Sequence, residues 1–170
     1  MITEKERRAL IARLGNLPTQ VEQAIDLLPP AQLDMPYRTG GWTPRQVVHH
    51  LADSHINAYI RMKLIATEDT PVLKPYDQEA WANTADYKMP IKVSLGILIG
   101  LHARWATWLE SIAADADVWR RAGMHPDDGR LTLDDLLPHY VAHGDKHVGH
   151  IRHRSQKSGV RSQNEEADGE

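Results

Sequence analysis

The chain has 170 residues, a formal net charge of −3 and a hydrophobic content of 41%, values typical of a globular protein with one well-buried core. It contains no cysteine, which excludes disulfides and a cysteine nucleophile, so any bound metal must rest on nitrogen and oxygen donors. The slight negative charge gives no general attraction to nucleic acid or to an acidic membrane.

Neither an export signal nor a membrane span is expected. The first residues, MITEKERRALI, are charged almost at once and lack the apolar stretch of a signal peptide. The longest uncharged, mostly apolar run, residues 93–101, is about half as long as a bilayer span. We therefore expect a cytoplasmic protein that does not bind membranes.

The first half of the chain predicts two long helices. Residues 3–28 have helical apolar spacing, with an interruption expected at Gly15-Asn16-Leu17-Pro18, and Pro29-Pro30 ends this segment. Thr43-Pro44 then marks the start of a second helix that continues to about Ala66, because threonine is a good N-cap and proline suits the first helical position.

The second half predicts a short helix within residues 76–83, a third long helix after Pro90, and a turn-rich connection at 123–130 with a small hairpin. Gly96 and Gly100 in the third helix favour close helix packing. The apolar face predicted for this helix consists of Val93, Ile97, Leu101, Trp105, Trp108 and Ile112.

The last helix is expected from about Leu133 to Gln156, capped by Thr132 with Asp135. Residues 159–170 contain almost nothing apolar and are expected to form a disordered tail. Four long helical segments without a convincing strand sheet or repeat predict an all-α fold. We expect one domain, residues 1–158, forming a four-helix bundle with a metal site between its helices.

Half of the ten histidines lie in the last helix, at positions 139, 143, 147, 150 and 153. The first four fall within an arc of roughly 80° on a helix, and an i, i+4 pair of imidazoles is a common way to bind a divalent ion. His143 and His147 are the best candidate pair, since apolar residues share their side. The alternative is a solvated histidine stripe, or one buried histidine satisfied by hydrogen bonds.

A third ligand has to come from another helix, and His50 is the candidate. It lies between Val47 and Leu51 on the apolar side of the second helix, whereas His49 is rotated away from that side. The alternative is a core histidine bonded to the backbone. Three neutral imidazoles would leave one position of the ion open, which is the pattern of a catalytic site.

The general base is less clearly indicated. Asp53 follows His50 by one turn and is a candidate base, or a residue that orients a ligand imidazole. A solvent-facing helix aspartate is an equal alternative. Ser54 and His55 have no matched third member, which disfavours a serine triad.

Two segments resemble the DinB/YfiT-like superfamily, and within it the YfiT group of metal-dependent hydrolases. They are GWTPRQVVHHLADSH at residues 41–55 and YVAHGDKHVGHI at residues 140–151, with Pro75-Tyr76-Asp77 between them. The resemblance implies a four-helix bundle that holds a divalent ion, zinc or nickel, one per subunit. It places the ligands on His50, His143 and His147. It also implies homodimers and, among relatives, bacillithiol-dependent and mycothiol-dependent enzymes.

Three functions are consistent with these observations. The first is a hydrolase that uses metal-activated water on a small-molecule substrate. The second is an S-transferase in which the ion binds the thiolate of a low-molecular-weight thiol such as bacillithiol, a reaction that the missing base favours slightly. The third is a non-catalytic metal-binding stress protein. No nucleic-acid partner is expected.

Overall fold

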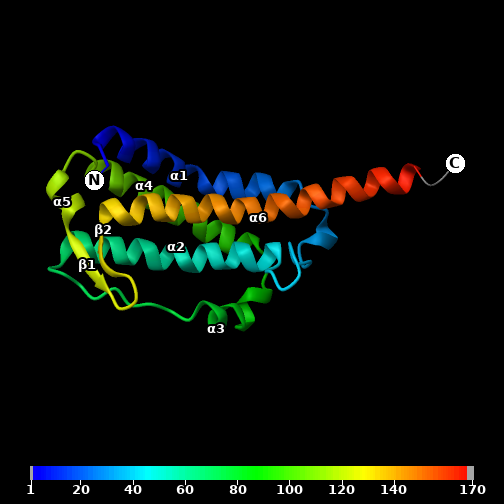
Figure 1. Cartoon of the computed structure of the whole chain (residues 1–170), viewed down its shortest axis with the longest axis horizontal. Helices are drawn as coiled ribbons and strands as arrows, with labels where there is room; N and C mark the ends of the chain where they lie inside the picture. The colour runs from blue at the N-terminus through cyan, green and yellow to red at the C-terminus, as the bar shows by residue number, and fades with distance from the viewer. Residues whose placement is uncertain (1, 168–170) are drawn as a thin grey trace.

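The computed structural model describes the backbone of residues 2–167 and the side chains of residues 2–153. Its four long helices are α1 (Glu4–Asp26), α2 (Pro44–Thr67), α4 (Lys92–Ser111) and α6 (Leu133–Ala167). They lie side by side as a bundle (Figure 1). Helices α1 and α2 each pack against both α4 and α6, so the predicted four-helix bundle is confirmed.

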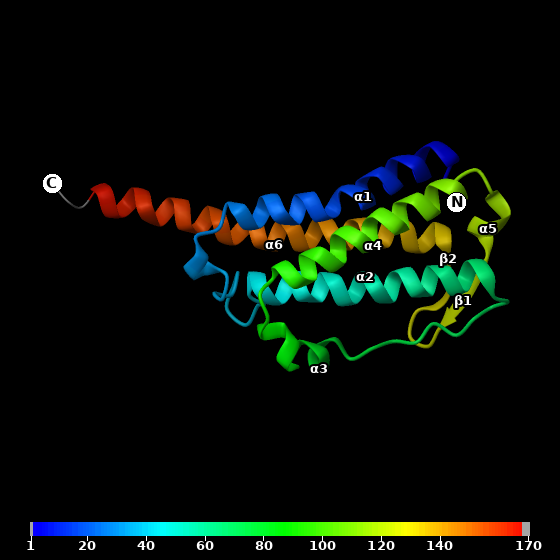
Figure 2. The ribbon, with the colours of Figure 1, turned by 180° about the vertical axis from the view of Figure 1, so that it is seen from behind.

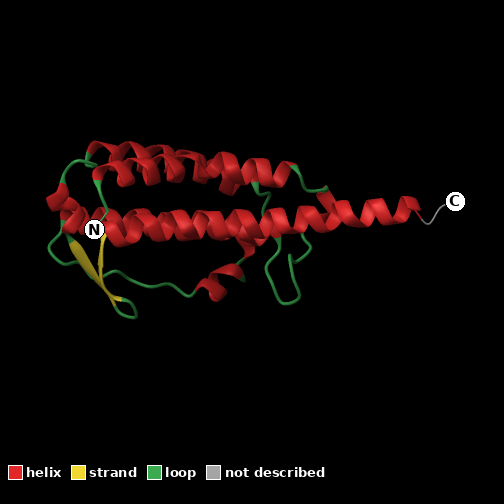
Figure 3. Cartoon of the chain, turned by 45° about the horizontal axis from the view of Figure 1, so that its top comes forward, coloured by secondary structure: helices red, strands yellow, loops and turns green. Residues whose placement is uncertain are grey.

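Short elements connect the long helices. They are the 3-10 helices η1 (Pro30–Gln32) and η2 (Ala85–Lys88), the helices α3 (Gln78–Ala82) and α5 (Ala116–Arg120), and the strands β1 (Ala122–His125) and β2 (Gly129–Thr132). The two strands pair antiparallel, with Ala122 opposite Thr132, as the small hairpin predicted at 123–130. Figure 3 shows this hairpin at one end of an otherwise helical molecule.

Capping residues fix where the helices begin. Thr43 forms a capping box with Gln46, and Pro44 occupies the first turn of α2. Thr3 forms the same box with Glu6 at the start of α1. At α6, the carboxylate of Asp135 accepts hydrogen bonds from the backbone N–H and the hydroxyl of Thr132. These side chains satisfy N–H groups that have no partner within the helix.

The interruption expected in the first helix was wrong. Helix α1 is continuous from Glu4 to Asp26 with Pro18 inside it, although it changes direction along its length (Figure 2). Leu14, Leu17 and Pro18 are all buried, so packing against the bundle outweighs the cost of a proline within a helix, about 3 kcal/mol.

The face predicted for α4 was also wrong in part. Val93 and Ile97 are 41% and 42% exposed, whereas Ser94, Leu98 and His102 are buried with Trp105. The helix turns its polar Ser94 and His102 inward because both hydrogen-bond to histidines of α2. A Cβ built on Gly96 or on Gly100 would meet nothing within 4 Å, so these glycines make no close packing within the described part of the chain.

Helix α6 continues past the predicted end at Gln156 as far as Ala167 and projects beyond the other three helices (Figures 1 and 2). Much of the segment expected to be a disordered tail, residues 159–170, is therefore traced as helix, and residues 168–170 lie outside the described residues. The described side chains end at His153, so the independence of this segment from the core stays a prediction. Among the described helices, none is long and apolar enough to cross a membrane.

Candidate metal centre

Three histidines from two neighbouring helices converge inside the bundle. His50 comes from α2, and His143 and His147 come from α6, one turn apart on the same side. One ring nitrogen from each of the three lies within 4.8 Å of the other two. The structure thus brings together the three residues that the sequence singled out.

The separation of the nitrogens suits one shared ion. Nε2 of His50 lies 3.2 Å from Nε2 of His143. Two imidazoles bound to one tetrahedral zinc at about 2.0–2.1 Å would have their nitrogens about 3.3 Å apart. Three imidazole nitrogens are also a donor set that suits a divalent transition metal. The residues therefore fit a divalent ion.

Burial also keeps these rings neutral, as metal ligands must be. Removal from water lowers the pKa of His50 to about 4. It lowers the pKa of His143 to about 3 and that of His147 to about 2, where neighbouring histidines act in the same direction. At neutral pH the three nitrogens are therefore available without first losing a proton.

Two further histidines lie behind the cluster. Nδ1 of His143 is 3.2 Å from Nε2 of His55, and Nδ1 of His55 is 3.0 Å from Nε2 of His102. Nδ1 of His102 is 2.7 Å from the carbonyl oxygen of Leu14. From the sequence, His55 is a candidate only for a serine triad, and His102 is not identified as a site residue. The sequence feature that could have identified His102 is its position as a lone histidine within the apolar stretch of α4.

No serine triad forms at this place. The hydroxyl of Ser54 donates to the carbonyl of Leu51 within its own helix, at 3.4 Å, and both nitrogens of His55 are occupied by other histidines. His49 likewise faces away from the cluster, with Nδ1 2.7 Å from the Ser94 hydroxyl and Nε2 3.1 Å from the Met89 carbonyl.

Asp53 is half-buried, and its carboxylate accepts a hydrogen bond from the Tyr87 hydroxyl at 2.8 Å. Burial raises the pKa of this carboxyl above its ordinary value. The structure gives it no hydrogen bond to His50, His143 or His147, among the residues described. Its role as a base or as an orienting residue stays a prediction.

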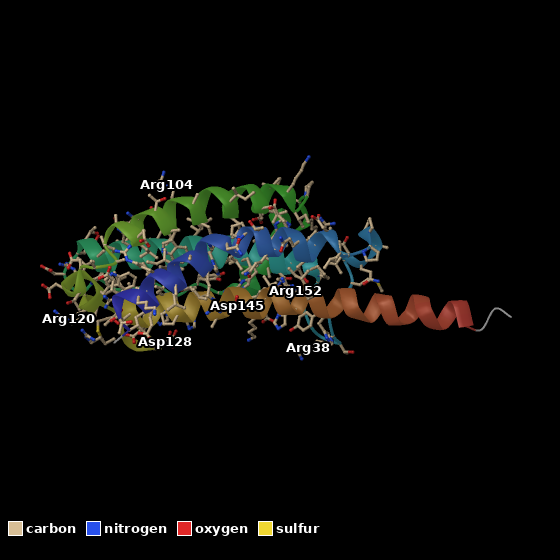
Figure 4. All side chains as sticks on the ribbon, turned by 90° about the horizontal axis from the view of Figure 1, so that it is seen from above. Arg38, Arg104, Arg120, Asp128, Asp145 and Arg152 are labelled. Carbon is tan, nitrogen blue, oxygen red and sulfur yellow. The ribbon has the colours of Figure 1, made fainter. Side chains whose placement is uncertain are left out.

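The remaining histidines of α6 lie at the edge of the site. His150 stacks on the ring of Tyr37, with the ring centroids 4.3 Å apart and an angle of 6° between the ring planes. The centroid of the His150 ring also lies 5.2 Å from that of His147. His139 and His153 are exposed. Asp145 points outward and pairs with Arg13 of α1 at 2.5 Å (Figure 4).

A cavity of about 300 Å³ reaches His143 and His147. Trp42 and Tyr37 line this cavity. The ring of Trp42 also packs against that of His50 in a T-shaped arrangement, with the ring centroids 4.7 Å apart. Two cationic side chains, Arg38 and Lys146, stand in its wall, and none of its lining residues carries a carboxylate. Figure 4 shows Arg38 beside α6. The charged side chains of the lining are therefore cationic.

These features define a helical bundle with a three-histidine candidate site for a divalent metal. The sequence profile described as the DinB superfamily matches residues 3–151. A protein of Oceanobacillus iheyensis is 44% identical over 141 residues, which cover 83% of this chain and 81% of that protein. The chain belongs to the DinB superfamily.

The similarity extends to a protein with a solved structure. YfiT of Bacillus subtilis, named "Putative metal-dependent hydrolase YfiT", is 42% identical over 160 residues, covering 93% of this chain and 89% of that protein. Its structure is described as "a probable metal-dependent hydrolase with an unusual four-helix bundle topology". It superposes with a TM-score of 0.88 over 94% of this chain and 91% of that one.

Proposed function

We propose that the protein is a metal-dependent hydrolase of small anionic substrates, with one divalent ion held by His50, His143 and His147. The observation that carries the proposal is the convergence of three neutral imidazoles, two of which, His143 and His147, line a cavity. When bound, an ion with three neutral ligands keeps its full charge and an open position, at which it lowers the pKa of water toward neutrality. Imidazole ligands suit zinc and nickel.

The residues around the cavity supply binding and orientation. Arg38 and Lys146 would attract an anionic group, because opposite charges at a cavity wall steer and hold a ligand. Trp42 and Tyr37 offer apolar ring surfaces against which the rest of a small substrate can pack. The relatives named as metal-dependent hydrolases support the same class of reaction.

A second candidate is thiol transfer, in which a low-molecular-weight thiol is the co-substrate. It is favoured by the absence of a carboxylate from the cavity lining and by the hydrogen bond that holds Asp53 on Tyr87. Hydrolysis usually needs a general base within reach of the attacking water. A thiol needs none, since a metal site deprotonates it directly.

Metal-depleted protein, reloaded separately with zinc, nickel or cobalt, would distinguish the candidates. Small esters and amides that carry a carboxylate or phosphate, and neutral analogues of them, would be the hydrolase substrates. We expect turnover of the anionic set only, lost with chelator and lost in His147→Ala. Activity that persists without metal would contradict the proposal. For thiol transfer, cobalt-loaded protein should develop a sulfur-to-metal absorption band when a small thiol is added.

The cationic wall has its own test. Arg38→Gln should raise KM for an anionic substrate more than it lowers kcat, because Arg38 binds substrate without taking part in the reaction. Arg104→Gln, an exposed arginine outside the lining, is the matched control and should change neither constant. Metal bound at one ion per chain, with no effect of any substrate or thiol, would instead favour a non-catalytic metal-binding protein.

A further inference from the structure

We propose that His55 and His102 are positioning residues that fix the tautomer of His143 and turn its Nε2 lone pair toward the metal centre. The proposal rests on the metal-binding function proposed above. It concerns the row of hydrogen bonds that runs from the backbone of α1 through α4 and α2 to α6. Each of the four helices contributes one member: Leu14, His102, His55 and His143.

The row begins at a carbonyl that the sequence leaves free. In an α-helix the carbonyl of Leu14 would accept from the backbone N–H four residues later, but position 18 is a proline and has no N–H. The Leu14 oxygen instead accepts a hydrogen bond from Nδ1 of His102 at 2.7 Å. A carbonyl can only accept, so the proton of His102 must be on Nδ1.

Each following hydrogen bond then has only one possible direction. A neutral imidazole carries one proton, so Nε2 of His102 is an acceptor and Nδ1 of His55 donates to it. Nε2 of His55 is in turn an acceptor, and Nδ1 of His143 donates to it. His143 is left with an unprotonated Nε2, the atom that lies 3.2 Å from Nε2 of His50.

The surroundings of the row keep its imidazole rings neutral. The side chains of His55 and His102 are fully buried, at 0% exposure, and the row contains imidazoles and one carbonyl but no carboxylate. A charged member would have to remain in the core without a counter-ion, which is costly.

Among the three candidate ligands, only His143 has this support. The Nδ1 atoms of His50 and His147 have no hydrogen-bond partner. Partners behind a ligand imidazole fix its orientation and its tautomer, and they are commonly carboxylates or carbonyls. A row of neutral histidines performs the same task without adding negative charge near the ion, so the ion remains a stronger electrophile.

The protonation pattern can be measured directly in the unmodified protein. Metal-free protein labelled with ¹⁵N-histidine at pH 7.5 should show His102, His55 and His143 as Nδ1–H tautomers by long-range ¹H–¹⁵N correlation. Finding His143 as the Nε2–H tautomer would overturn the proposal. This measurement needs no variant and no bound metal, so it remains valid even if the wild-type protein binds no zinc, the result that would defeat the proposed function.

Variants test whether the row matters for metal binding. His102→Leu removes the hydrogen bonds of this ring to Leu14 and His55 and should weaken zinc binding, by at most the roughly 10–100-fold that loss of a direct partner of a ligand costs. His102→Gln keeps one donor and one acceptor and should restore much of that loss. His49→Leu, which removes a buried histidine of α2 outside the row, should bind zinc like the wild type.

Zinc affinity would be measured by competition with a chromophoric chelator, and the fold of each variant by circular dichroism. A folded His102→Leu protein that binds zinc as tightly as the wild type would contradict the proposal. Equal losses in the Leu and Gln variants would also contradict it, because they would indicate a packing role alone. If His102→Leu does not fold, the tautomer of His143 decides the question.

Discussion

The metal-free protein should be unusually sensitive to mild acid. Several histidines are buried as neutral rings, and burial lowers the pKa of each below its ordinary value of about 6.5. In the unfolded chain the same rings would bind protons freely as the pH falls through 6.5. As the pH falls, the unfolded state therefore gains protons that the folded state cannot accept, and the free energy of unfolding decreases. The rings concerned are His50, His55, His102, His143 and His147.

The size of the effect follows from these shifts. The lowered pKa values lie at about 4 or below, so the folded rings stay neutral down to about pH 5. Between pH 7.5 and 5.5 each imidazole of the unfolded chain changes from mostly neutral to mostly charged. This change lowers the free energy of unfolding by about 1.4 kcal/mol per ring. The four rings with these values together cost about 6 kcal/mol, and the buried His55 changes stability in the same direction. The loss is comparable to the whole stability of a typical domain, about 5–15 kcal/mol.

Urea unfolding of chelator-treated protein at pH 7.5, 6.5 and 5.5, followed by circular dichroism, would measure this loss. We expect a folded protein at pH 7.5 and a largely unfolded one near pH 5.5. His102→Gln should reduce the loss between these pH values by about 1.4 kcal/mol, whereas substitution of the exposed His139 by Gln should not change it. A free energy of unfolding that is the same at pH 7.5 and 5.5 would refute the reasoning.

Three further predictions concern the ligands, the glycines and the end of α6. Elemental analysis should find one divalent ion per chain in His49→Ala and none in His143→Ala; full retention in the latter would contradict the assignment. Gly144→Ala should lower the free energy of unfolding, measured in urea, by about 1 kcal/mol, because its Cβ would lie 2.8 Å from a Leu17 methyl and overpacking outweighs helix propensity. Gly96→Ala, with open space around it, should instead stabilise by about 1 kcal/mol. Removal of residues 159–170 should change the melting temperature little, and a large loss would show that this segment docks on the core.

Much of the fold and the candidate trio could be predicted because both depend on local rules. The helix starts follow from capping residues, as at Thr43 and Thr132. His143 and His147 are four residues apart, so any helix through them places both rings on one side. His50 could be chosen over His49 because its apolar neighbours mark the inner face of α2, and the structure places His50 beside His143 and His147.

The face of α4 could not be predicted by the same rule. Its first half contains hardly any polar residue to mark the outside, so hydrophobic spacing does not define a direction. Its orientation is set by partners on another helix: Ser94 bonds to His49, and His102 bonds to His55. Which polar residues of one helix will meet those of another is a property of the assembled bundle, and spacing within one segment does not contain it.

Two positions where local rules fail, Pro18 and His102, are linked through the carbonyl of Leu14. A proline within a helix and a histidine within an apolar helix are each unfavourable when considered alone. In the bundle, Pro18 removes the N–H that would have occupied the Leu14 carbonyl, and His102 supplies a replacement at 2.7 Å. The carbonyl that Pro18 leaves unpaired and the buried N–H of His102 thus pair with each other. The row of hydrogen bonds that begins there ends at His143. Conflicts between local preference and global fold are expected at functional sites, and here the conflict leads directly to the candidate metal centre.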